Sequence, residues 1–242
     1  MRATRAEAWE TLTEYTKSEA LLRHALAVEA SVGFYAHLYG EDEDFWRATA
    51  LLHDFDYEIH PTLDRHPQDG APILRELGYP EDLIESVLSH AEHLEMPRDT
   101  QLKRVLFACD ELSGFVHACG LVRPTGLDGL EPKSVKKKLK QPSFAAGVHR
   151  DEVYAGAELL GLSLDDHISN VVAALQPIAL ATWSPSCWGS RRPRRGAPRR
   201  RTTAASASCA PTWASGRRGR WAARARRRGR SPRARRTRTG SA

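Results

Sequence analysis

The sequence predicts an all-α protein followed by a long basic segment. Through the first 180 residues, apolar side chains recur at intervals of three and four, the spacing of a helix with one buried face. No period-2 alternation typical of a half-buried β-strand appears. Composition changes near residue 180, because residues 181–242 contain no Ile, Leu, Val, Phe, Met or Tyr. We therefore expect an all-α domain over residues 1–180 and a disordered segment over residues 181–242.

Caps and helix breakers predict where the helices begin and end. Thr4-x-x-Glu7 and Thr16-x-x-Glu19 have the form of capping boxes, so we expect a helix to open at each, the second ending at Gly40. Gly78 and Gly161 are typical of residues that follow a helix C-terminus. Later helices are expected over 44–55, 66–78, 80–96, 103–119, 149–160 and 165–180. About 180 residues in this pattern can bury an adequate core.

The net charge of +6 combines two parts of opposite sign. Residues 1–182 hold 17 Lys and Arg against 30 Asp and Glu, a net charge of −13, whereas residues 183–242 hold 19 Arg and no acid. The basic overall charge is therefore no sign that the helical part binds nucleic acid.

Several function classes are disfavoured by composition. No run of eighteen apolar residues could span a membrane, and the N-terminal residues lack the apolar core of a secretory signal. The four cysteines show no Cys-x-x-Cys spacing, which argues against a disulfide framework or a zinc ribbon. We expect a cytoplasmic protein.

Four expected helices direct an imidazole or a carboxylate toward the core. These side chains are His24, the pair His53-Asp54, His90 and Asp110. An unpaired buried carboxylate is strongly destabilising, and a shared divalent cation would compensate both acids and orient the imidazoles. Mixed nitrogen and oxygen ligands suit Mn, Fe, Co, Ni, Zn or Mg.

The order of these residues resembles the H…HD…D pattern of the HD-domain superfamily of metal-dependent phosphohydrolases. The stretches "LLRHALAVEA", "ALLHDFDYE", "HPQDGAPIL" and "VLFACDELSGF" look like those of small bacterial HD proteins described as predicted hydrolases. The resemblance covers residues 15–180 and implies a helical bundle that binds one or two ions. The ligands it implies are His24, His53, Asp54 and Asp110, with His66 and His90 added for a second ion.

The sequence also departs from common members of that superfamily. Many relatives read His-Asp-Ile-Gly-Lys, whereas this chain has Asp56 two residues after Asp54 and lacks the lysine. It also lacks the His-His-Glu and Gly-Tyr-Pro features of the cyclic-dinucleotide group, so we do not predict that activity.

We expect metal-dependent hydrolysis of a phosphoester or phosphoanhydride in a small metabolite, with a nucleotide as the first candidate. A bound divalent ion can lower the pKa of water from about 15.7 to about 7 and polarise a phosphoryl oxygen. Asp54 and Asp56 are the expected catalytic residues, Asp56 orienting the water; a solvated loop acid or a helix cap is the plainer interpretation of Asp56. The expected phosphate contacts are Lys133, Lys136 and Lys137, as a lid, and Arg65. The plainer interpretation of the lysines is a solvated helix face.

Two other function classes stay open. A few proteins on this scaffold are diiron oxygenases, and the same six ligands would serve two irons. A non-catalytic module that binds a nucleotide and regulates a partner is the third class.

The segment over residues 181–242 uses only Ala, Arg, Cys, Gly, Pro, Ser, Thr and Trp. These are the residues whose codons carry C or G at the second position, which selection on protein chemistry has no reason to require. A GC-rich gene read out of frame would produce this pattern. We interpret the segment as a frameshift product that is disordered and binds nucleic acid nonspecifically through its arginines.

Overall fold

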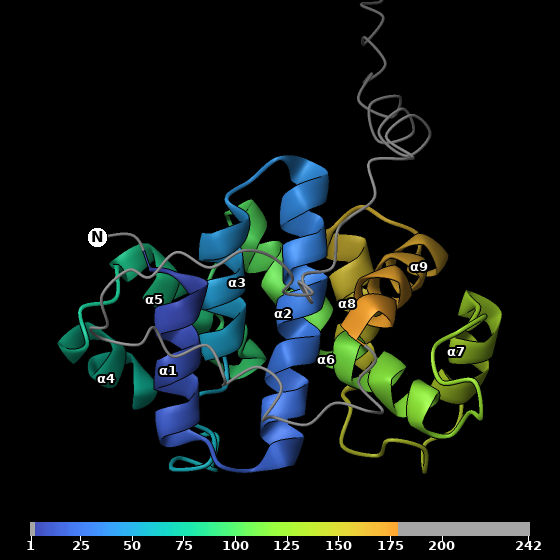
Figure 1. Ribbon diagram of the computed structural model, residues 1–242, viewed down its shortest axis with the longest axis horizontal. Coiled ribbons are helices and arrows are strands. Elements are labelled where there is room, and N and C mark those ends of the chain that lie inside the picture. The colour runs from blue at the N-terminus through green and yellow to red at the C-terminus, as the bar shows by residue number, and fades with distance from the viewer. Residues whose placement is uncertain (1–2, 179–242) are drawn as a thin grey trace, which may run out of the picture. The chain divides into compact units, whose positions relative to one another are not determined.

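The computed structural model describes residues 3–178 (Figure 1), and the all-α prediction is confirmed, because these residues contain helices and no strand. The basic segment over 181–242 lies outside the described residues. The α-helices are α1 (Arg5–Tyr15), α2 (Glu19–Tyr39), α3 (Glu43–Leu52), α4 (Gly70–Glu76), α5 (Glu81–Leu88), α6 (Gln101–Leu121), α7 (Pro132–Leu139), α8 (Arg150–Leu159) and α9 (Leu164–Leu175). Two 3-10 turns are η1 (Glu92–Leu94) and η2 (Gln176–Ile178). Over these residues, no helix is long and apolar enough to cross a membrane.

One of the two predicted capping boxes is present and the other is wrong. The Thr4 hydroxyl accepts from the backbone N–H of Glu7, and the Glu7 carboxylate accepts in return from the N–H of Thr4. Thr16 instead ends α1, and its hydroxyl donates to the carbonyl of Phe55 at 3.0 Å. The sequence pattern predicted that the Thr16 hydroxyl caps the N-terminus of a helix, but in the structure this hydroxyl makes a tertiary contact instead.

Three helices are shorter than the apolar pattern predicts. Helix α3 ends at Leu52, α4 begins only at Gly70, and α5 ends at Leu88. Side chains help end two of these helices, since the Nδ1–H groups of His53 and His90 donate to the carbonyls three residues before them. Both histidines consequently lie just past a helix end, where their rings turn away from the helix.

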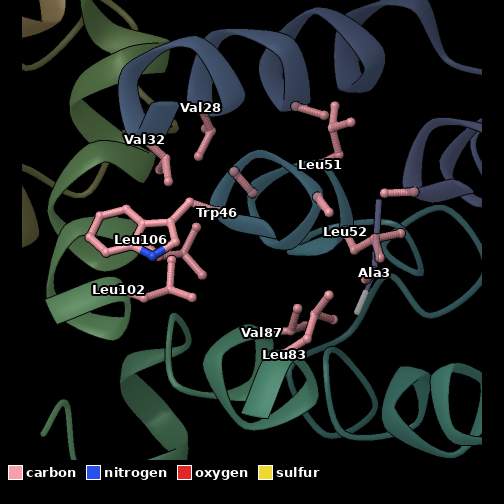
Figure 2. Packing of buried hydrophobic residues seen from close by; sticks show 14 of the residues in the cluster. Ala3, Val28, Val32, Trp46, Leu51, Leu52, Leu83, Val87, Leu102 and Leu106 are labelled. Atoms are coloured by element: carbon pink, nitrogen blue, oxygen red, sulfur yellow. The ribbon is translucent and has the colours of Figure 1, made fainter. Parts of the chain in front are cut away.

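The two longest helices, α2 and α6, cross at the centre of the described bundle, and the shorter helices cover them on either side (Figure 1). Helices α1, α3, α4 and α5 lie on one side, and α7, α8 and α9 on the other. In Figure 2, Val28 and Val32 of α2 face Leu51 and Trp46 of α3, with side chains of α5 and α6 closing the cluster. Burying such aliphatic and aromatic side chains contributes roughly 1.5–3 kcal/mol each.

A second apolar cluster joins α6 to the later helices. It contains Phe115 and Val116 of α6, Val153 of α8 and Ile168 of α9. Helices α6 and α8 approach so closely that a Cβ atom built on Gly156 would lie 2.7 Å from the Cα of Ala108. The two clusters hold α6 on both faces, which fixes the position of Asp110 in the middle of that helix.

Candidate metal centre

Six side chains converge where α2 and α6 pass the ends of α3 and α5. Each of the four histidines presents its Nε2 atom to a carboxylate oxygen, and Asp54 lies among all of them. The structure thus brings together all six ligands expected from the sequence: His24, His53, Asp54, His66, His90 and Asp110.

The first group of ligand atoms surrounds the Oδ2 atom of Asp54. His24 Nε2 lies 2.9 Å from Asp110 Oδ1, 3.1 Å from His53 Nε2 and 3.6 Å from Asp54 Oδ2. His53 Nε2 lies 3.4 Å from both carboxylates. Four donor atoms, two nitrogens and two oxygens, therefore enclose one small volume.

The second group surrounds the other oxygen of the same carboxylate. His66 Nε2 lies 3.2 Å and His90 Nε2 lies 3.3 Å from Asp54 Oδ1. Asp54 thus presents one oxygen to each pair of histidines.

These spacings fit the coordination shell of a divalent transition ion. Ligand atoms that lie about 2.1 Å from an ion, in tetrahedral or octahedral directions, are separated by roughly 3.0–3.4 Å. Most of the separations above fall within or close to that range. The Nε2 atoms of His24 and His53 also lie close enough to each other, at 3.1 Å, to be neighbours in one coordination shell. The donor set therefore fits a cation.

In three of the imidazoles, the Nδ1 atom makes a hydrogen bond that fixes the orientation of the ring. His53 Nδ1–H donates to the carbonyl of Ala50 at 2.7 Å, and His90 Nδ1–H donates to that of Val87 at 2.6 Å. Protonation at Nδ1 leaves Nε2 with its lone pair, which is the form that binds a metal.

Asp56 provides this support for the third imidazole. Its side chain has no exposed surface; Oδ1 accepts from His66 Nδ1 at 2.9 Å, and Oδ2 lies 3.2 Å from His60 Nδ1. We expected Asp56 to orient a water molecule, but imidazole rings engage both of its oxygens. The carboxylate thus holds the ring of His66 from its Nδ1 side, and its role in orienting a water molecule stays a prediction.

The charges of the centre favour the presence of a cation, as the pKa values of its side chains show. Burial lowers the pKa of His53, but Asp54 and Asp110 outweigh it and hold that pKa well above its usual range. Burial likewise opposes a raised pKa at His66, which Asp54 and Asp56 nevertheless bring to about 9. Burial raises the pKa of Asp54, yet His53, His66 and His90 hold it well below its usual range. A cation would supply the charge that these carboxylates attract.

Part of the centre is open to solvent. The side chains of His24, Asp54 and Asp110 are 24%, 19% and 16% exposed, whereas His53 is fully buried. Solvent therefore reaches the centre at these three side chains.

The expected phosphate contacts do not gather at this opening. Arg65 lies on the surface and pairs with Asp69 at 2.8 Å. Lys136 pairs with Asp165 of α9 at 2.6 Å, and Lys133 and Lys137 are exposed on α7, which packs against α9 and α6. Their contact with a substrate stays a prediction.

Three residues near His24 escaped the sequence-based prediction. Buried nitrogens of Arg23 and His117, Nε and Nε2 respectively, have no hydrogen-bond partner. Burial lowers the pKa of His117, and the charges of Arg23 and His24 lower it further, so the three side chains share one neighbourhood. Burial, reinforced by the charge of Asp110, raises the pKa of Glu111 to about 7. Arg23 adjoins a predicted ligand in the sequence, but nothing in the sequence pairs it with His117.

Part of the chain is similar to known proteins. Residues 21–114 match the model of the family described as HD domain. Ribonuclease Y of Nitratidesulfovibrio vulgaris, in strains DP4 and Hildenborough, is 32% identical over 98 residues. The aligned segment is 40% of this chain and 18% of Ribonuclease Y, so the chain spans less than a fifth of the length of these relatives. No solved structure matches the chain significantly.

Proposed function

We propose that this chain, whose residues 21–114 match the HD-domain model, is a metal-dependent hydrolase of a phosphoester or phosphoanhydride in a small metabolite. The observation that carries the proposal is the pair of ligand groups on the two oxygens of Asp54. His24, His53 and Asp110 would hold one divalent ion and His66 and His90 the other, with Asp54 between them. Such ions, when bound, lower the pKa of water and polarise a phosphoryl oxygen.

Residues around the centre fix the orientation and the tautomer of its imidazoles. The carbonyls of Ala50 and Val87 keep two imidazoles in the metal-binding tautomer, and Asp56 does the same for His66. We therefore propose Asp56 as a positioning residue and Asp54 as the residue that ties the two halves of the centre together.

Arg23 and His117 are the proposed contacts for the substrate's phosphate. Arg23 Nε and His117 Nε2 are buried without a hydrogen-bond partner, and the charges of Arg23 and His24 both lower the pKa of His117. The Nη2 group of Arg23 also pairs with Glu19 at 2.8 Å. A guanidinium is well suited to a phosphoryl group, because it donates to two oxygens at once. Glu111, with a pKa of about 7, is the nearest candidate for a group that gives or takes a proton at neutral pH.

The acidic charge of the helical part favours a small substrate over a polyanion. The relatives are named as ribonucleases, and both RNA and small phosphoesters contain the bond that this centre would hydrolyse. Residues 1–182 carry a net charge of −13, which disfavours the approach of a long polyanion.

The test is turnover by protein loaded with Mn, Co, Ni, Mg or Fe, measured over nucleotides, sugar phosphates and a short RNA. We expect phosphate release that Asp54→Ala abolishes and that Arg23→Gln weakens mainly through KM. Arg75→Gln is the matched control, because Arg75 pairs with Glu81 on the surface away from the centre. Absence of turnover with every metal, or undiminished turnover in Asp54→Ala, would refute the proposal. Iron in stoichiometric amount with oxygen consumption would indicate a diiron oxygenase, and nucleotide binding without turnover a regulatory module.

A further inference from the structure

A separate cavity of about 280 Å³ lies between the C-terminal end of α6 and α7. Cys119, Val122 and Leu130 form apolar parts of its wall, and Arg123, Lys137 and Lys138 bring three cationic groups to it. No acidic residue lines it. A concentration of positive charge around an apolar hollow is unusual in a helical part whose net charge is −13.

The cations are held at the cavity without being neutralised. Arg123 is fixed by hydrogen bonds to the carbonyls of Gly126 and Asp128, at 3.0 and 2.8 Å. The ammonium group of Lys138 lies 4.4 Å from the centre of the Phe144 ring. Among the described residues, neither Lys137 nor Lys138 has an acidic partner, whereas Lys136 on the same helix pairs with Asp165.

Two of these cations act on Cys119, which lines the cavity. Burial raises the pKa of the Cys119 thiol to about 11, and the positive charges of Lys138 and Arg123 oppose this effect. Both cations therefore act on the same buried sulfur atom, although they come from different segments of the chain.

This cavity is distinct from the metal centre. Cys119 follows Asp110 by nine residues in the continuous helix α6, which places it about 13 Å further along the axis and about half a turn around it. The two sites therefore open on opposite faces of α6.

We propose that the cavity binds a small organic anion. Its phosphate, sulfonate or carboxylate group lies against Lys137, Lys138 and Arg123, and its apolar part lies against Val122 and Leu130. The volume is close to the lower end of small-molecule sites, roughly 300 Å³, so the ligand is about the size of one or two fused rings. The charge-assisted contacts of the anion replace the acidic partners that the lysines lack.

Calorimetric titration of the full chain with three probes tests the proposed ligand chemistry. Naphthalene-1-sulfonate has both the anionic and the apolar part and cannot be hydrolysed as a phosphoester. Sulfate has only the first part and 1-naphthalenemethanol only the second. We expect saturable binding of naphthalene-1-sulfonate that is tighter than that of either partial probe. No saturable binding, or equal binding of the neutral alcohol, overturns the proposal.

Two double variants test the location with the same loss of charge. Lys137→Ala with Lys138→Ala removes lining residues, whereas Lys133→Ala with Lys140→Ala removes two lysines of the same segment that do not line the cavity. We expect at least about a tenfold rise in Kd, or about 1.4 kcal/mol, for the first pair and little change for the second. Equal weakening by both pairs would show nonspecific attraction to α7 and overturn the site. Binding that is lost in Asp54→Ala would place the probe at the metal centre and overturn it too.

Discussion

Replacing Gly70 with alanine should disable one half of the metal centre and spare the other. A Cβ atom at this position would lie 2.7 Å from Cγ and 2.8 Å from Oδ2 of Asp56, closer than real Cβ atoms approach. The Asp56 carboxylate cannot rotate away freely, because His66 and His60 hold its two oxygens. The added methyl group must therefore displace Asp56 and, through it, the ring of His66.

Gly70→Ala should affect both the free energy of unfolding and the affinity for metal. Overpacking at a buried site costs about 1–3 kcal/mol, and the preference of helix interiors for alanine offsets little of it, because Gly70 is the first residue of α4. Loss of the carboxylate that supports a metal-binding histidine typically lowers affinity about 10- to 100-fold. We expect that loss for the ion held by His66 and His90 alone.

The assay is a calorimetric titration of metal-free protein with Mn²⁺ or Co²⁺. Wild type should show two binding events, and Gly70→Ala one event of unchanged affinity and one that is weakened. Gly147→Ala is the control, because its Cβ would meet nothing within 4 Å. If Gly70→Ala binds both ions as wild type does, or loses both equally, Asp56 does not support His66 in the way proposed.

Two further predictions concern the second half of the bundle. Gly156→Ala should lower the free energy of unfolding in urea by about 1–3 kcal/mol, because its Cβ meets the backbone of Ala108. Gly33→Ala is the control and should change stability far less, because its Cβ meets the flexible end of Arg47. Equal effects of the two substitutions would contradict the close packing of α6 against α8. His167 is fully buried, and burial lowers its pKa from 6.5 to about 4, so its neutral form stabilises the fold above pH 6.5 and that stability is lost as pH falls toward 4. A shift of this size corresponds to roughly 3 kcal/mol. Urea midpoints between pH 7 and pH 4.5 should fall more steeply for wild type than for His167→Gln, and parallel curves would refute the assignment.

Sequence alone predicted the helices and the convergence of ligands, but not the details that depend on tertiary contacts. The box at Thr4 formed because its partners are local, whereas the hydroxyl of Thr16 found the carbonyl of Phe55, 39 residues away. Helix periodicity predicted that His24 and Asp110 face the core, and the resemblance to HD proteins added His66.

The contacts of Asp56 could not be predicted from the sequence for a related reason, and its role in orienting a water molecule stays a prediction. Its place two residues after Asp54 indicates an acid near the centre, but only the fold shows that it lies behind His66. The proximity of Arg23 and His117 likewise depends on how α2 and α6 cross, which no pattern in either segment specifies. The position of the α7 lysines depends on how α7 packs against α9 and α6, which their charge density does not specify.

The metal content of the purified protein tests the bridging role of Asp54 most directly. Elemental analysis after loading with Mn²⁺ and desalting should give two ions per chain for wild type. His24→Ala and His66→Ala should each retain one ion, and Asp54→Ala should retain neither at full occupancy, because both ligand groups lose an oxygen. One ion in wild type that His66→Ala leaves unchanged, or two ions in Asp54→Ala, would contradict a centre built on this carboxylate.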